Sequence, residues 1–269
     1  MIVNVLTIAG SDSGGGAGIQ ADLKTFSALG VYGASVITAL TAQNTRSVSA
    51  IHDVPPDFVT AQLDAVFDDI AFAAVKIGML SRPKIIDAVA DGLRRHGARN
   101  VVLDPVMVAK SGDRLLPPDA IAALKERLLP LATVITPNLP ESAVLLGLEE
   151  ARDEAGMIDA AARLRALGPQ AVLLKGGHLD KDAQSIDVLD DGGEPLTLAA
   201  PRIATENTHG TGCTLSSAIA ALLARGLPLR AAVAEAKAYV SAAIRAADHL
   251  QVGHGHGPVH HFHALWRED

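Results

Sequence analysis

Short apolar runs alternate along the chain with longer segments of helical periodicity. The apolar runs predict strands at Val3–Ala9, Val36–Leu40, Ala74–Ile77, Val101–Leu103, Val134–Thr136 and Ala171–Leu174. Helical spacing of hydrophobic residues predicts helices at Ala17–Leu29, Asp57–Asp69, Lys84–Arg95, Glu141–Leu148, Cys213–Arg225 and Leu229–Leu250. The segment Ser185–Ala199 contains an Asp-Gly-Gly turn and predicts two or three antiparallel edge strands. This alternation is typical of an α/β protein whose mostly parallel sheet is covered by helices on both faces.

The chain shows no internal repeat, no low-complexity tract and no linker long enough to divide it. We therefore predict one domain that spans residues 1–269. Ligands of such folds bind at the carboxyl ends of the strands. Several glycines and polar residues of this sequence stand at predicted strand ends, and they are the candidates for function.

Composition excludes several classes of protein. The 269 residues carry a formal net charge of −7 and no basic block, which argues against binding to nucleic acid or to an anionic membrane. One cysteine excludes a disulfide framework and fits a reducing compartment. No apolar run reaches the roughly 18–20 residues of a membrane-spanning helix, and the first residues lack the positive region of a signal peptide. We expect a soluble, cytoplasmic protein.

The first candidate site is the glycine-rich loop within Ala9–Gly18, between a predicted strand and a predicted helix. Its glycines let a ligand approach the backbone closely. The dinucleotide pattern Gly16-x-Gly18-x-x-Ala21 falls inside the predicted helix start and lacks a following acidic partner. A P-loop pattern would need glycine at Leu23, so we expect Lys24 on a solvated helix face. The interpretation that we favour is a ligand-facing loop of another kind.

The second candidate is Gly210-Thr211-Gly212-Cys213, which leads directly into an alanine-rich helix. Free N–H groups and the helix dipole attract anions to a helix start, so this motif predicts an anion site. Cys213 would lie in the first turn, where we expect the pKa of the thiol to fall below its free value of about 8.5. The structural alternative is a buried cysteine capped by a glycine turn.

Further polar residues stand at other strand ends. Asp104 and Glu141 offer two carboxylates without a nearby His or Cys, which suits a hydrated Mg²⁺ better than Zn²⁺. Lys175 can reach a phosphate as a point charge, and the Gln43 carboxamide offers both a donor and an acceptor. Each also has a structural interpretation, as a turn cap, a helix N-terminal charge, a surface lysine or a turn residue. Their shared position at strand ends favours a joint role.

Histidines gather near the C-terminus. The cluster comprises His249, His254, His256, His260, His261 and His263. Its glycine-rich spacing gives no common ligand-bearing face, so we favour a loop that lines a pocket or packs back on the domain over a metal site.

Taken in order, these motifs resemble the hydroxymethylpyrimidine/phosphomethylpyrimidine kinases of thiamine biosynthesis, within the ribokinase-like superfamily. The resemblance covers essentially the whole chain and rests on Leu6–Asp12, Gly15–Thr25, Thr41–Thr45, Asp104–Met107, Thr136–Asn138, Lys175–His178 and His209–Cys213. It implies a three-layer α/β sandwich without the superfamily's large β lid, and a homodimer. The implied activity is two successive ATP-dependent phosphorylations of 4-amino-5-hydroxymethyl-2-methylpyrimidine, to the monophosphate and then to the diphosphate.

The resemblance also implies roles for individual residues. The anion hole and the base correspond to Gly210, Thr211, Gly212 and Cys213. Asp104 and Glu141 correspond to the Mg²⁺ and water shell, and Lys175 to a phosphate contact. The pyrimidine pocket corresponds to Gly10, Ala17, Asp22, Gln43, Met79 and Val106. Many sugar kinases of the superfamily have Asp where this chain has Cys213.

Three other functions remain open from the sequence. A pyridoxine or pyridoxal kinase, or a dual-specificity enzyme, can share the Gly-Thr-Gly-Cys motif, although Gln43 favours an aminopyrimidine. A non-catalytic pyrimidine or nucleotide sensor could use the same scaffold, but it would not need the charged residues together with the anion hole. A dinucleotide oxidoreductase depends only on the loose glycine pattern.

Overall fold

The computed structural model describes residues 1–107, 116–177 and 184–266. Within these ranges nine strands form one sheet in the order β3-β2-β1-β4-β5-β6-β7-β8-β9. The strands are β1 (Asn4–Asp12), β2 (Tyr32–Gln43), β3 (Val48–Asp53), β4 (Ala74–Ile77), β5 (Val101–Leu103), β6 (Val134–Ile135), β7 (Ala171–Lys175), β8 (Gln184–Asp190) and β9 (Leu196–Pro201). Pairing is parallel from β2 across to β7 and antiparallel for β2–β3, β7–β8 and β8–β9. The predicted mostly parallel sheet is confirmed.

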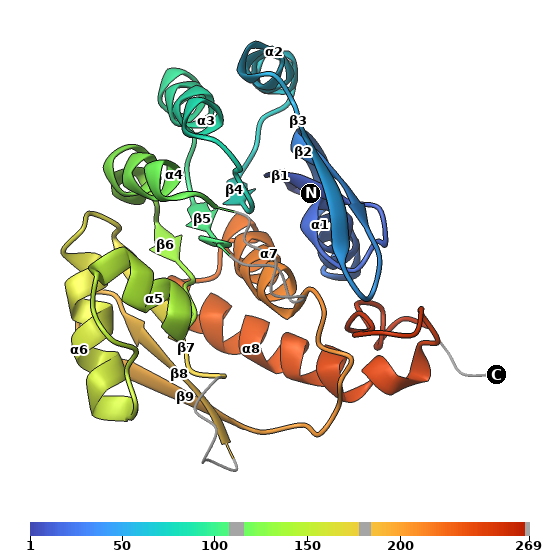
Figure 1. Cartoon of the computed structure of the whole chain (residues 1–269), viewed down its shortest axis with the longest axis vertical. Coiled ribbons are helices and arrows are strands. Elements are labelled where there is room, and N and C mark those ends of the chain that lie inside the picture. Colours follow the sequence, from blue (N-terminus) through green and yellow to red (C-terminus); the bar gives the residue numbers. More distant parts are fainter. Residues whose placement is uncertain (108–115, 178–183, 267–269) are drawn as a thin grey trace.

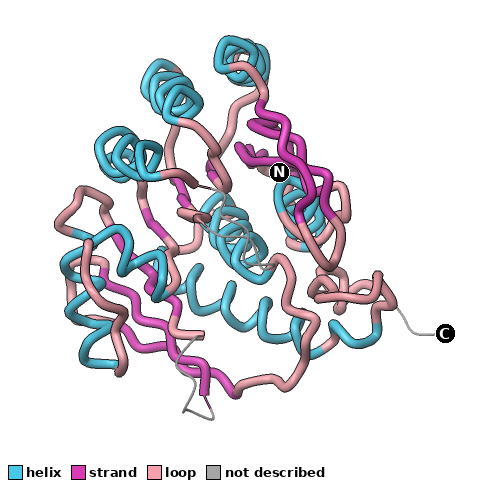
Figure 2. The backbone as a smooth tube through the Cα atoms, viewed as in Figure 1, coloured by secondary structure: helices cyan, strands magenta, loops and turns pink. Residues whose placement is uncertain are grey.

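Helices cover both faces of this sheet, as Figure 1 and Figure 2 show. On one face lie α1 (Gly18–Ala28), α7 (Thr211–Ala224) and α8 (Leu229–Arg245). On the other lie α2 (Pro56–Phe67), α3 (Pro83–Arg95), α4 (Pro118–Ala123), α5 (Leu139–Leu146) and α6 (Glu154–Arg165). Each face has its own hydrophobic core, so the molecule has the three layers predicted. None of the described helices is long and apolar enough to cross a membrane.

α3 is buried on one face and α7 on all sides, and the sequence pattern explains this difference. In α3, Ile86 and Val89 recur at helical spacing and are buried. Arg94 and Arg95 occupy the last turn, where positive charges interact favourably with the helix dipole. Every residue of α7 from Thr214 to Ala224 is buried. Small alanine and serine side chains let α7 pack closely between the sheet and its neighbouring helices.

The structure contains elements that the apolar pattern does not predict. Both faces of β3 are largely exposed, so its residues show no buried alternation. In α6 only Met157, Ala161 and Leu164 are buried, too few to mark a helix clearly. The segment after α4 continues as a π-helix (Leu124–Leu128) and a 3₁₀-helix (Leu129–Leu131). The predicted helix at the C-terminal end stops at Arg245 and is followed by a 3₁₀ turn.

The parallel strands bring the predicted site residues to one edge of the sheet. Gln43 ends β2 and Lys175 ends β7, while Asp104 directly follows β5. The carboxyl ends of parallel strands share an edge, and the first turn of α7 reaches the same edge beside Asp104. The fold therefore assembles the site from segments far apart in the sequence.

Candidate active site

The first turn of α7 has the backbone geometry that the predicted anion site requires. Its N-cap, Gly210, has φ +79°, a left-handed conformation that glycine adopts without strain. A side chain there would also overlap the carbonyl oxygen of Gly16. The Thr214 N–H donates to the Gly210 carbonyl at 2.8 Å and closes the first turn. The N–H groups at the start of a helix have no acceptor within it, so they can bind an anion.

Lys175 and Asp104 form an ion pair directly beside this turn. The Lys175 Nζ lies 3.0 Å from Asp104 Oδ1, which also accepts the Thr136 hydroxyl at 3.0 Å. A Cβ on Gly212 would lie 3.3 Å from both Asp104 Oδ2 and Lys175 Nζ, so glycine allows α7 to approach the pair. Burial opposes charge on Lys175, but the carboxylates of Asp104 and Glu141 outweigh it and raise the pKa of the ammonium. A permanent cation therefore stands beside the anion site.

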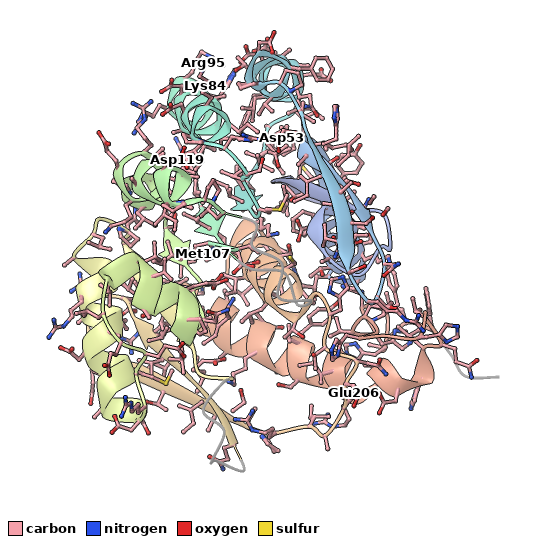
Figure 3. All side chains as sticks on the ribbon, in the orientation of Figure 1. Asp53, Lys84, Arg95, Met107, Asp119 and Glu206 are labelled. Carbon is pink, nitrogen blue, oxygen red and sulfur yellow. The ribbon has the colours of Figure 1, made fainter. Side chains whose placement is uncertain are left out.

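Glu141 is held rigidly near this pair by a capping box at the start of α5. Its Oε2 accepts the Asn138 N–H and its own N–H donates to Asn138 Oδ1, both at 2.8 Å. The Met107 N–H also donates to the Glu141 carboxylate, and Figure 3 labels Met107 on the segment after β5. Burial and the charge of Asp104 raise the pKa of Glu141 to about 7, although Lys175 acts against them. The capping box agrees with the structural interpretation of Glu141 at a helix N-terminus, and its role toward Mg²⁺ stays a prediction.

The carboxylates of Asp104 and Glu141 fit the sequence prediction of a magnesium site. Within the described residues no three His, Cys, Asp or Glu side chains converge in a way that would hold a metal ion. Mg²⁺ in phosphoryl-transfer sites uses one or two carboxylates and completes its shell with water and substrate phosphates. A nearby cation would also favour ionised Glu141. The donor set is therefore suitable for hydrated Mg²⁺, whose presence remains a prediction.

Asp12 organises the glycine-rich loop and ties it to α7. Its carboxylate accepts the N–H groups of Gly14, Gly16 and Ala17 at 2.8, 3.0 and 2.8 Å. Its Oδ2 also lies 2.8 Å from Nε2 of His209, in the loop before α7. Although burial opposes ionisation, these partners hold the pKa of Asp12 below its usual range. The loop and the anion site are thus fixed relative to each other.

Four of the predicted pyrimidine-pocket residues, Gly10, Ala17, Gln43 and Met79, lie in this loop or against it. A Cβ on Gly10 would come within 2.7 Å of Met79 Cε, so these two residues are in close contact. Gln43 Oε1 accepts the Thr41 hydroxyl at 3.1 Å, and its Nε2 lies 3.3 Å from His209 Nε2. Ala17 and Val106 are half-buried beside Asp12 and Asp104 respectively. Gly10 and Met79 are therefore brought together, while Gln43 borders the other end of the loop.

Asp22, the sixth predicted pocket residue, does not reach the surface of the protein. The residue is fully buried, and both carboxylate oxygens lie 2.8 Å from Lys76 Nζ. The same carboxylate accepts the hydroxyls of Thr7 and Ser217 at 2.6 and 2.7 Å. A side chain with no exposed surface cannot contact a ligand unless the protein rearranges. The predicted direct contact of Asp22 with a ligand therefore does not fit the structure, in which Asp22 joins α1 to β1, β4 and α7.

Cys213 lies in the first turn of α7 as predicted, but its expected acidity is wrong. The residue is half-buried, and the Gly18 N–H donates to its sulfur. Burial, reinforced by the negative charges of Asp22 and Asp104, raises the pKa of the thiol to about 11, although Lys76 opposes this rise. Loss of solvation here outweighs the effect of the helix dipole.

The histidine-rich C-terminal segment packs back onto the site, as the favoured interpretation predicts. His209 and Pro258 form a parallel bridge, and His261 Nε2 lies 3.1 Å from the Thr214 hydroxyl in α7. Burial lowers the pKa of His261 to about 3, so its ring is neutral. In Figure 1 this red segment also lies beside the turn between β2 and β3, and His256 N–H donates to the Thr45 carbonyl there at 2.9 Å.

Three residues of the site were not singled out from the sequence. Asp12 and His209 stand inside the quoted motifs, but nothing in a single sequence shows that they pair. Lys76 gave a clearer signal, because a charged residue interrupts the apolar run Ala74–Ile77.

Lys24, expected on a solvated face, instead donates to the Gly15 carbonyl at 2.7 Å. That expectation is wrong because the glycine loop folds back over the helix start.

Comparisons with known proteins agree with this geometry. A family model described as phosphomethylpyrimidine kinase matches residues 12–260. A hydroxymethylpyrimidine/phosphomethylpyrimidine kinase of Rhizobium meliloti (strain 1021) is 63% identical over 268 residues, with 100% of each chain covered. A thiamine biosynthesis bifunctional protein ThiED of Geobacter sulfurreducens is 58% identical over 258 residues, which are 96% of this chain and 52% of that protein.

A crystal structure of Bacillus subtilis pyridoxal kinase in complex with ADP is 40% identical, with a TM-score of 0.91 and coverage of 99% of this chain and 100% of that chain. This likeness agrees with the predicted ribokinase-like fold, and all strands of the described residues belong to one sheet without a separate β lid. The family model spans most of the sequence, and a relative of 63% identity covers all of it. The chain belongs to the phosphomethylpyrimidine kinase family.

Proposed function

We propose that this chain uses ATP to phosphorylate 4-amino-5-hydroxymethyl-2-methylpyrimidine to the monophosphate and then to the diphosphate, in thiamine biosynthesis. Membership of the family supports this activity. The observation that carries it is the meeting of the α7 start with the Lys175–Asp104 pair at Gly212, beside the glycine-rich loop. One kinase domain spanning 1–269 and a cytoplasmic location are part of the proposal, and the single continuous sheet supports the former.

The charged side of the site would stabilise the transferred phosphoryl group. The first-turn N–H groups of α7, with Gly210 and Gly212 leaving the backbone open, would donate hydrogen bonds to its oxygens. The Lys175 ammonium would neutralise part of its charge. Asp104 and Glu141 would hold Mg²⁺ through water, and that ion supplies further neutralisation of the ATP phosphates when bound. Lys175 would then be the cation that the protein itself supplies, whether or not Mg²⁺ is bound.

We assign Cys213 to the position of the base for the hydroxymethyl group. With the pKa of the thiol near 11, only a small fraction is thiolate at neutral pH. Positioning and charge neutralisation therefore supply most of the rate, as phosphoryl transfer commonly allows. In the second step the nucleophile is an oxygen that already carries charge, so no base is required. A thiol that stays neutral does not repel that phosphate.

The other side of the site would recognise the ring. We assign ring contacts to Gly10, Ala17, Gln43, Met79 and Val106, with Asp22 supporting them from below. The Gln43 carboxamide can accept from an exocyclic amine and donate to the adjacent ring nitrogen. Asp12 and His209 would keep the loop that carries Ala17 in place.

Pyridoxal is a second candidate substrate. The structural neighbour of 40% identity is named pyridoxal kinase, and its chain matches over nearly the full length. A pyridoxal ring lacks the amine next to a ring nitrogen that Gln43 can pair with on both sides. Gln43 therefore favours the aminopyrimidine as the better substrate of this chain.

A homodimer is also part of the proposal. The β2–β3 edge of the sheet exposes Leu40 (46%), Ala42 and Ala50 on one face and Ile51 (39%) on the other. Exposed apolar side chains on a sheet edge favour association with a second copy. Light scattering of the purified chain measures its mass in solution, and a monomeric mass at micromolar concentration would exclude this part.

A coupled assay of ADP release tests the function directly. The purified chain is offered the aminopyrimidine alcohol, its monophosphate and pyridoxal in parallel, with excess Mg²⁺. We expect turnover of the first two, and a lower specificity constant for pyridoxal. Turnover of pyridoxal alone would replace the proposed function with the second candidate, and turnover of none would leave a binding protein.

A further inference from the structure

A closed polar cluster lies under the start of α7. Lys76 and Asp22 are both fully buried, and the Lys76 Nζ lies 2.8 Å from each carboxylate oxygen. Thr7 and Ser217 donate their hydroxyls to the same carboxylate. The four residues come from β4, α1, β1 and α7, so the cluster joins two strands of the sheet to the two helices that bear the site.

The cluster faces Cys213. Ser217, which bonds Asp22, is four residues after Cys213 on α7, and residues at this spacing share a helix face. Gly18, which donates to the Cys213 sulfur, begins the helix that carries Asp22. The charged groups that act on this sulfur are Lys76 from β4, Asp22 from α1, Asp104 after β5 and Lys175 at the end of β7. Of the two cations, Lys76 is the one whose side chain has no exposed surface.

Packing fixes the ammonium at this place. A Cβ on Gly78 would lie 2.8 Å from Lys76 Nζ and 3.0 Å from the Ala9 side chain, so glycine leaves just enough room beside the ammonium. Although burial opposes its charge, Asp22, Cys213 and Asp104 raise the pKa of Lys76, so it stays positive. An enclosed ion pair adds little net stability, because removing both charges from water costs about as much as their attraction returns. Stability alone therefore gives a weak reason for placing this pair under the site.

We propose that Lys76 is a positioning residue for the first phosphorylation: its buried ammonium, held by Asp22, supports the thiolate form of Cys213. The role rests on the proposed function only where Cys213 takes the proton of the hydroxymethyl group. In that step the thiolate gains the proton, the alkoxide oxygen bonds to the γ-phosphorus and ADP leaves. The second phosphorylation has an anionic nucleophile and does not need this support.

Alkylation of Cys213 tests the proposal without any substrate, because the chain has one cysteine. The rate of reaction with iodoacetamide is measured from pH 7.5 to 9 in excess Mg²⁺, where the rate reports the thiolate fraction. We expect Lys76→Met to slow the reaction by about tenfold or more, since a nearby opposite charge shifts a pKa by about one unit or more. Lys76→Met/Asp22→Asn, which keeps the hydroxyl partners and leaves no unpaired charge, should slow it in the same direction by a smaller factor.

The matched control is another largely buried lysine–aspartate pair, Lys237–Asp187, whose atoms lie 2.7 Å apart between α8 and β8. Lys237→Met/Asp187→Asn should leave the alkylation rate of Cys213 within twofold of the parent. If Lys76→Met fails to fold, the alkylation rate of Lys76→Met/Asp22→Asn decides. An unchanged alkylation rate in the folded Lys76 variants overturns the proposal, whether or not the chain has the proposed kinase activity.

Kinetics supply the second measurement. In Lys76→Met/Asp22→Asn, kcat for the alcohol should fall several-fold more than kcat for the monophosphate, with KM for ATP little changed. Equal losses in both steps would mean that the cluster only supports the fold, and would overturn the proposal. Failure of the proposed function is a different result, because the parent chain would then phosphorylate neither substrate while the alkylation data would still stand.

Discussion

Lys76 and Lys175 are two lysines of one sheet, each paired with an aspartate, and they have different surroundings. Lys76 lies within β4 and has no exposed side-chain surface. Its ammonium lies under α1 and α7, which cover the same face of the sheet. Lys175 is the last residue of β7, and 15% of its side chain is exposed. Carboxylates raise the pKa of both ammonium groups against the effect of burial.

The difference shows that position along the strand decides what a buried cation can do. At the carboxyl end of a parallel strand, Lys175 is open to a ligand, and we expect it to exchange its contact with Asp104 for a phosphate. Ile77 and Gly78 separate Lys76 from that edge, and Asp22 with its hydroxyl donors closes the space around the ammonium. Lys76 can act only through its field and through the packing that it holds together.

The largest expected effect is on stability, from Lys76→Met. Breaking a buried ion pair leaves Asp22 charged and unpaired, which should lower the free energy of unfolding by about 3–5 kcal/mol. Urea denaturation followed by circular dichroism measures this loss. Lys76→Met/Asp22→Leu, which removes both charges, should recover most of it. If the single substitution costs less than about 1 kcal/mol, the pair is not the enclosed ion pair described above.

Lys175→Met should have the next largest effect, but on activity. Loss of one preorganised charge at a transferring group commonly lowers kcat by about 10²–10³-fold, and both phosphorylations should slow. Lys175→Arg is the matched control, since it keeps the charge and should retain more activity. Lys175→Met should lower the free energy of unfolding, measured by urea denaturation, by less than Lys76→Met does. Water can replace the ammonium at the partly exposed position of Lys175. Equal stability losses for the two lysines would remove the contrast.

These two lysines also show what the sequence could predict. Lys175 was found because it ends an apolar run and precedes two glycines, so local pattern and fold class together place it at the site. Lys76 interrupts an apolar run, which signals a buried partner, but the partner Asp22 lies 54 residues away on α1. Pairing across such a distance depends on helix placement, which periodicity does not encode. The prediction of a lowered thiol pKa for Cys213 is wrong for a related reason, because the burial of this thiol depends on neighbours from three other segments of the chain.

Gln43→Met tests recognition, on the side of the site away from both lysines. An aminopyrimidine edge left against a thioether loses paired hydrogen bonds worth about 1–3 kcal/mol, so the preference over pyridoxal should fall by roughly 5–150-fold. The ratio of the two specificity constants measures this change. Gln43→Glu is a useful companion, because it keeps an acceptor for the amine and loses the donor. A ratio that stays the same in both variants would show that Gln43 does not face the ring.

Glu141 allows a pH test beside Lys175. Its folded pKa of about 7 lies above the usual 4.5, so the folded protein binds this proton more tightly than the unfolded chain does. The stability from this group is therefore complete below about pH 4.5 and is lost as the pH rises through 7, a change of about 1–3 kcal/mol without added Mg²⁺. Thermal denaturation in EDTA at pH 5.5 and 8 should show it, and Glu141→Gln should abolish this part of the pH dependence. Excess Mg²⁺ should reduce it if the ion binds the carboxylate.

The smallest effect is expected at Cys213, where the two steps should separate. Because little thiolate is present at neutral pH, Cys213→Ala should lower kcat for the alcohol by about tenfold and hardly change kcat for the monophosphate. Cys213→Asp should keep or improve the first step and impair the second. A carboxylate there repels the incoming phosphate by about 1 kcal/mol at 4 Å in water, and by more in a partly desolvated site. Rapid-quench measurement of each product separates the steps. Equal losses in both steps for both substitutions would leave Cys213 a packing residue of the anion site, and Lys76 would then have no group to act through.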